Sequence, residues 1–72
     1  MRKFNNEQLN VINTGKSYGI DTSLFANPDY SREQMYKIML GLVNGVDITP
    51  YVSPSSSLSE METVVRDMIR GR

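Results

Sequence analysis

Apolar residues recur at helical spacing in two stretches of this chain. In each stretch they occupy positions i, i+3, i+4, i+7 and i+8, the pattern of an amphipathic helix. They are Met35, Ile38, Met39, Leu42 and Val43 in the first stretch, and Met61, Val64, Val65, Met68 and Ile69 in the second. A third stretch, near the N-terminus, carries the end signals of a helix but is more polar. We predict an all-α fold with helices at about 6–18, 32–44 and 58–70.

The ends of these predicted helices have their own signals. Each is preceded by a residue that favours the N-cap, and three positions later a Gln or Glu completes a capping box. The pairs are Asn5 with Gln8, Ser31 with Gln34, and Ser57 with Glu60. After each helix stands a glycine, which adopts the left-handed conformation of a helix C-terminus at least cost. These glycines are Gly19, Gly45 and Gly71.

The chain matches itself when it is shifted by 26 residues. Residues 4–29 and 30–55 form two full units, and 56–72 form a truncated third one. A period in this range is typical of stacked helical units, so we expect one domain, residues 1–72, built as a small helical-repeat bundle. The first two units share Glu7/Glu33, Gln8/Gln34, Ile12/Ile38, Gly15/Gly41, Gly19/Gly45, Asp21/Asp47 and Pro28/Pro54.

A short element is predicted after each of the first two helices. Asp21 and Asp47 each resemble a cap followed by one helical turn, and Pro50 falls in the first turn, where its missing N–H is harmless. Phe25 and Tyr51 are equivalent in the repeat. We expect both rings to fill the gap between successive long helices.

Composition narrows the function classes. Eight basic and eight acidic residues give a net charge of zero, which argues against a general polyanion binder. The chain has no Cys and no His, so thiol nucleophiles, disulfides, the commonest general base and the usual zinc ligands are missing. We therefore expect no enzymatic activity, no cofactor and no metal. Without an apolar run of about 18 residues or a signal-peptide core, the chain is expected to be cytoplasmic.

One segment of the repeat resembles a known pattern. It comprises Glu33-Gln34-Met35, Ile38, Gly41-Leu42, Gly45-Val46-Asp47-Ile48, Tyr51 and Pro54. This segment is similar to a tandem helical repeat of phage and integrative-element proteins from Gram-positive bacteria. The resemblance implies a helical repeat and an origin in a mobile element, and it assigns no activity to any residue.

Tyr36 and Leu40 are the candidate partner-binding residues. On a helical wheel they lie about 90–130° from the centre of the apolar stripe. Either the middle helix, flanked on both sides, needs a wider apolar face, or the two residues form a patch for a protein partner. The equivalent positions hold Asn10 and Thr14 in the first unit, and Glu62 and Arg66 in the third.

Four further positions have two interpretations each. Gly15 and Gly41 lie inside helices and indicate close approach, either by a partner or by a neighbouring segment of the same chain; their recurrence in two units favours the second interpretation. Asp21 and Asp47 are carboxylates, but they stand one unit apart and each has a capping role, so metal binding is not favoured.

The last predicted helix carries mixed charges. Glu62 and Arg66 have the i, i+4 spacing of an ion pair. Arg66, Arg70 and Arg72 form a small basic end that is a candidate phosphate-binding edge, and Arg2 and Lys3 add basic residues at the other end of the chain. The apolar stripe of 58–70 also suggests a homodimer through this helix.

Two functions follow as hypotheses. The first is a protein-binding module, such as an inhibitor or adaptor from a mobile element that docks on a host protein. A defence effector of the CRISPR type would be one such host protein, which makes the chain an anti-CRISPR candidate. The alternative is a nucleic-acid-binding accessory protein that uses Arg66, Arg70 and Arg72.

Overall fold

Three long helices begin at the predicted caps. The computed structural model describes residues 3–71, in which α1 spans Asn6–Ser17, α2 spans Arg32–Val43 and α3 spans Leu58–Arg70. A complete capping box stands at each N-terminus, with the cap side chain accepting from the backbone N–H three residues later. The described residues contain no strand. The all-α prediction is confirmed, and the helix ends differ from the predicted ones by at most one residue.

The glycines after the helices do not all behave alike. Gly19 and Gly45 have φ angles of 74° and 84°, so the left-handed prediction is confirmed for both. For Gly71 the prediction is wrong, because its φ is −77°. Its N–H donates to the Asp67 carbonyl at 2.9 Å, which continues the hydrogen-bonding pattern of α3. At Gly19 and Gly45, in contrast, the chain turns back into a connecting segment.

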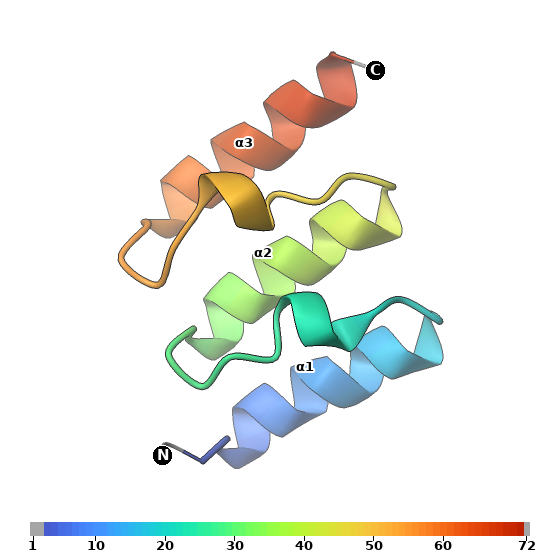
Figure 1. Ribbon diagram of the computed structural model, residues 1–72, viewed down its shortest axis with the longest axis vertical. Helices are drawn as coiled ribbons and strands as arrows, with labels where there is room; N and C mark the ends of the chain where they lie inside the picture. Colours follow the sequence, from blue (N-terminus) through green and yellow to red (C-terminus); the bar gives the residue numbers. More distant parts are fainter. Residues whose placement is uncertain (1–2, 72) are drawn as a thin grey trace.

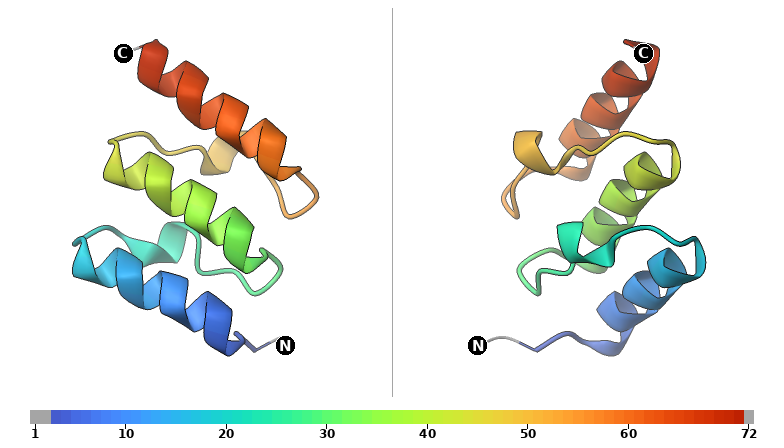
Figure 2. Two further views of the ribbon diagram at one scale, coloured as in Figure 1. Left: turned by 180° about the vertical axis from the view of Figure 1, so that it is seen from behind. Right: turned by 45° about the vertical axis from the view of Figure 1, so that its right-hand side comes forward.

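The connecting segments form a second layer. Each contains a short 3-10 helix, η1 at Thr22–Leu24 and η2 at Thr49–Tyr51. Figure 1 shows the three long helices side by side and parallel, with α2 in the middle, and Figure 2 shows η1 and η2 together on one side of them. The molecule is a slab of 35 × 27 × 16 Å. One broad face of this slab is therefore formed by the long helices alone.

The core lies between the two layers. Its fully buried side chains come from α2, α3 and both connecting segments. They are Phe25, Met35, Ile38, Met39, Ile48 and Met61. None of the helices in residues 3–71 is long and apolar enough to cross a membrane.

The two aromatic residues of the connecting segments differ in burial. Phe25 is fully buried as predicted, whereas Tyr51 is 67% exposed, so the prediction for Tyr51 is wrong. The short helix of the second unit starts one residue later than its counterpart, with Pro50 in its first turn. Ile48 is buried instead, where the first unit has the smaller and only half-buried Thr22. An aliphatic side chain fills this space without the hydroxyl that a buried Tyr51 would have to satisfy.

Gly15 and Gly41 permit close approach within the chain itself. A Cβ on Gly15 would lie 2.9 Å from the Phe25 ring, and a Cβ on Gly41 would lie 3.1 Å from the Val46 carbonyl oxygen. Both neighbours belong to the segment that follows the respective helix. The interpretation based on internal packing is the one that the structure supports.

Two buried glutamines tie each helix to the next connection. Gln8 Nε2 donates to the carbonyls of Pro28 and Tyr30 at 3.1 and 2.6 Å. Gln34 Nε2 repeats this pattern 26 residues later, donating to Pro54 and Ser56 at 2.9 Å each. In both glutamines Oε1 accepts the N–H of the capping residue. Each glutamine side chain therefore caps the start of the helix that contains it and also holds the connecting segment that leads into the next long helix.

Candidate functional site: a groove between α2 and α3

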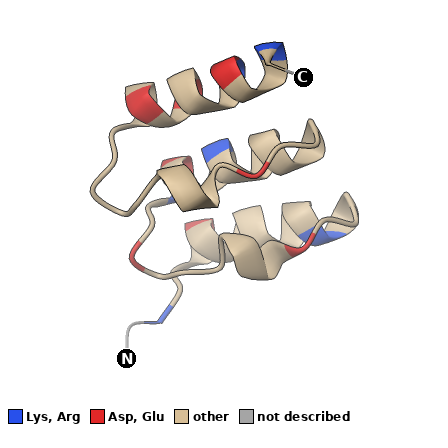
Figure 3. Cartoon of the chain, turned by 45° about the horizontal axis from the view of Figure 1, so that its top comes forward, with Lys and Arg blue, Asp and Glu red and all other residues tan. Residues whose placement is uncertain are grey.

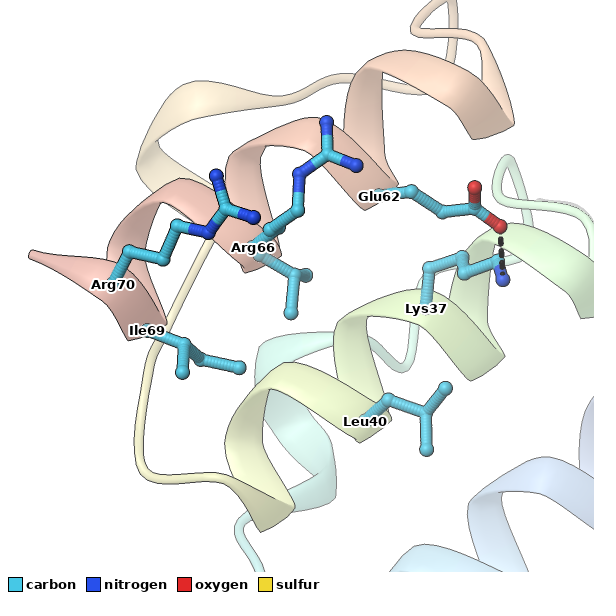
Figure 4. A pocket seen from close by; sticks show the side chains of 7 residues that line it. Lys37, Leu40, Glu62, Arg66, Ile69 and Arg70 are labelled. Atoms are coloured by element: carbon cyan, nitrogen blue, oxygen red, sulfur yellow. Dashed lines mark ion pairs between the residues drawn. The ribbon is translucent and has the colours of Figure 1, made fainter.

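A groove on the helical face separates α2 from α3. Its volume is about 380 Å³, and Figure 4 shows Leu40 of α2 and Ile69 of α3 on either side of it. Apolar side chains and charged side chains share its walls. The lining residues are Lys37, Leu40, Glu62, Val65, Arg66, Ile69 and Arg70.

A second hollow of about 320 Å³ adjoins the first. Lys37 and Glu62 line both hollows, so their ion pair stands between them. Tyr36 belongs to this second hollow, whereas Leu40 belongs to the first. The other lining residues are Val11, Arg32, Glu33 and Leu58.

An ion pair between Lys37 and Glu62 lies at the groove. The Lys37 ammonium hydrogen-bonds the Glu62 carboxylate and holds its pKa below the ordinary 4.5, with a smaller contribution from the charge of Arg66. The predicted partner of Glu62 was Arg66. In the structure the ion pair is made with Lys37 instead, because packing of α3 on α2 brings the two side chains together.

The candidate partner-binding residues lie outside the core. Tyr36 is 46% exposed, and Leu40 is half-buried but is not among the side chains packed against the core. A wider apolar face on α2 therefore does not account for Tyr36. Binding of a partner by either residue stays a prediction.

The basic residues fall into different places. Arg66 and Arg70 are exposed on α3 and line the same groove as Leu40, a proximity that the sequence did not reveal. Lys3 precedes α1, with α2 lying between α1 and α3. Arg2 and Arg72 lie outside the described residues. Figure 3 shows acidic as well as basic residues on all three long helices, so none of these helices carries charges of one sign only.

Sequence reasoning missed Lys37, Val65 and Ile69 as neighbours of Leu40. One signal was available: Lys37 and Glu62 are 25 residues apart, as are Glu7 and Arg32, whose side chains form an ion pair at 3.0 Å. Two oppositely charged residues whose separation in the sequence is one residue shorter than the repeat period therefore indicate a contact between adjacent parallel helices.

The acidic residues of the connecting segments are engaged locally. Asp21 accepts from the hydroxyl and the backbone N–H of Ser23, and these hydrogen bonds lower its pKa. Asp47 accepts from Thr49 in the same way, at 2.6 and 2.9 Å. Within residues 3–71, no three His, Cys, Asp or Glu side chains are grouped so as to hold a metal ion.

The apolar stripe of α3 is less covered than that of α2. Met61 is buried, but Val64 and Val65 are half-buried where their equivalents Ile38 and Met39 are fully buried. The helix α3 lies at the edge of the row, with a neighbouring long helix on one side only (Figure 1). A homodimer through 58–70 stays a prediction.

Comparison with protein family models, with curated proteins and with solved structures gave no match to this chain. The groove itself offers apolar contact and charged hydrogen-bond donors. Such an arrangement is suited to binding.

Proposed function

We propose that this protein is a non-enzymatic protein-binding module whose binding face is the helical side of the slab around Tyr36 and Leu40. The observation that carries the proposal is the pair of adjoining hollows, one next to each of these residues. An exposed aromatic residue beside a hollow with both apolar and charged walls is typical of the anchor points of protein interfaces.

A comparison among the three units supports this choice of face. Several buried positions keep their apolar character from one unit to the next, as Met35 and Met61 do. The outward positions change completely. In a helical array the core positions maintain the stacking, so a surface that changes from unit to unit is free to fit a partner. These outward pairs are Asn10 and Thr14, Tyr36 and Leu40, and Glu62 and Arg66.

The class of partner is proposed from the resemblance of 33–54 to repeats of mobile elements. A small inhibitor or adaptor of a phage or integrative element acts in the host cytoplasm by docking on a host protein. A defence effector of the CRISPR type is one such target. Capture of partners from host cells, identified by mass spectrometry, would supply the protein for the binding test.

The binding test compares two double variants. Tyr36→Ala with Leu40→Ala should weaken binding at least tenfold, or about 1.4 kcal/mol, while helicity by circular dichroism stays unchanged. The matched control is Asn10→Ala with Thr14→Ala, at the equivalent exposed positions of α1, and it should bind like wild type. Equal affinity of all three proteins, or loss of helicity in the first variant, would contradict the proposed face.

Nucleic-acid binding is the second candidate function. It is favoured by Arg66 and Arg70, whose guanidinium groups have no ion-pair partner in residues 3–71. If phosphates bind there, affinity for a DNA duplex should fall steeply with salt, and removal of both arginines should flatten that dependence.

A further inference from the structure

We propose that the groove between α2 and α3 takes an acidic, amphipathic peptide segment of a partner protein. An apolar side chain of the segment would contact Leu40, Val65 and Ile69, and its carboxylates would meet Arg66 and Arg70. This inference rests on the proposed function and specifies the chemistry of the ligand.

The apolar part of the groove calls for an apolar ligand group. Ile69 is 39% exposed, and Val65 and Leu40 are half-buried, although each lines the same hollow. A volume of about 380 Å³ falls within the range of ligand pockets. Seating a side chain of the size of Leu or Phe there would remove these three residues from water.

The charges of the groove determine the sign of the ligand. Among the described residues that line the groove, the one acidic residue is Glu62, and it is already paired with Lys37. Arg66 and Arg70 remain on the α3 side, and no carboxylate of residues 3–71 lies within ion-pair distance of either. Guanidinium groups bind carboxylates through two parallel hydrogen bonds, so acidic side chains are the complementary partners.

Two other occupants fit less well. In the groove, a nucleic acid would meet two arginines that make no ion pair within residues 3–71, and its phosphates would leave the apolar wall unused. A second copy bound through this groove by two-fold symmetry would double its charged lining residues, which are three basic residues and Glu62. The excess of positive charge disfavours such an interface, so a homodimer through α3 would have to use the other side of that helix.

The test is a selection of peptides from a random-peptide display library on the intact chain, followed by methyl NMR. Selected peptides should contain an apolar residue flanked by Asp or Glu, and they should shift the methyl signals of Leu40, Val65 and Ile69. The variant Arg66→Glu with Arg70→Glu should bind these peptides at least tenfold more weakly. The control Lys3→Glu with Lys16→Glu carries the same change in net charge on exposed residues away from the groove, and it should stay within about twofold.

Each other result has a definite meaning. Neutral or basic peptides that shift the Leu40 signals would overturn the acidic ligand and leave the proposed binding face intact. An equal loss of affinity in the two charge variants would also overturn it, because a long-range field rather than Arg66 and Arg70 would then attract the peptides. Displacement of the peptides by a DNA duplex at physiological salt would overturn it in favour of a nucleic-acid site. If no peptide shifts the Leu40 signals, the acidic ligand and the binding face both fail.

Discussion

Lys37 of α2 and Glu62 of α3 form an ion pair that separates the groove beside Leu40 from the hollow beside Tyr36. The Glu62 side chain is 56% exposed, so this pair contributes little to stability by itself. Its effect is on the proposed binding face, where it neutralises the one acidic side chain among the described residues that line the groove.

The ion pair predicts a pH dependence. The pKa of Glu62 is lower in the folded chain than its ordinary value of 4.5, so the unfolded chain takes up the proton first as pH falls. The contribution of the ion pair to the free energy of unfolding is complete above the ordinary pKa of 4.5. It is lost as pH falls further, through the lower pKa that Glu62 has in the folded chain. We expect Glu62→Gln to reduce the fall in melting temperature below pH 4.5. Asp67→Asn on the same helix should retain the full dependence, because Asp67 makes no ion pair in residues 3–71.

The buried glutamine of α2 predicts a difference between two opposite substitutions. Gln34→Glu keeps an acceptor for the Ser31 N–H but removes both donors to the Pro54 and Ser56 carbonyls, and it should cost about 1–3 kcal/mol in urea unfolding. The reverse change in α3, Glu60→Gln, should stay within about 0.5 kcal/mol, because Glu60 is exposed. Equal effects would mean that the glutamine donors do not stabilise the connection.

The two aromatic residues of the connecting segments should respond differently to truncation. Phe25→Ala empties a fully buried site that contacts Gly15, so a loss of about 3–5 kcal/mol is expected. Tyr51→Ala removes a ring that is 67% exposed and should change stability by less than about 0.5 kcal/mol. Thermal melts of the two variants are sufficient, and a large loss for Tyr51→Ala would contradict its exposed position.

The ends of α2 can be tested by a further pair of substitutions. Ser31→Ala removes the N-cap oxygen that accepts from Gln34 N–H and should cost about 1 kcal/mol. Gly45→Val should cost more, because a β-branched residue resists the φ of 84°. The control is Gly71→Ala, which should melt like wild type because Gly71 has a φ of −77° and needs no left-handed conformation. Wild-type melting of Gly45→Val would contradict the left-handed helix end.

Local signals made the helices predictable. Caps, glycines and apolar spacing act within a few residues of each other, so Ser31 with Gln34 locates the start of α2 without knowledge of the fold. The error at Tyr51 has a different origin. Equivalence in the repeat implied equal burial, but one substituted residue, Ile48, and the later start of η2 moved the buried position three residues back.

The groove depends on packing between helices and could not be predicted from either helix alone. Leu40 and Arg66 were separate candidates, one for a protein and one for phosphate, and they became neighbours only when α3 packed on α2. The residues that join them, Val65 and Ile69, looked like ordinary members of the apolar stripe. They line the groove because they lie where α3 packs against α2.

The double role of Gln34 makes residues 30–55 a module that can be copied. Near the end of this segment the Pro54 carbonyl accepts from Gln34, and at its start the Tyr30 carbonyl accepts from Gln8 of the preceding unit. In a chain carrying the segment twice, Glu33 of the first copy would stand 25 residues before Arg32 of the second, the separation that pairs Glu7 with Arg32. A tandem duplication of 30–55 should therefore lengthen the row by one long helix and leave the groove beside α3 unchanged. The length of the resulting scaffold would be set by the number of inserted units.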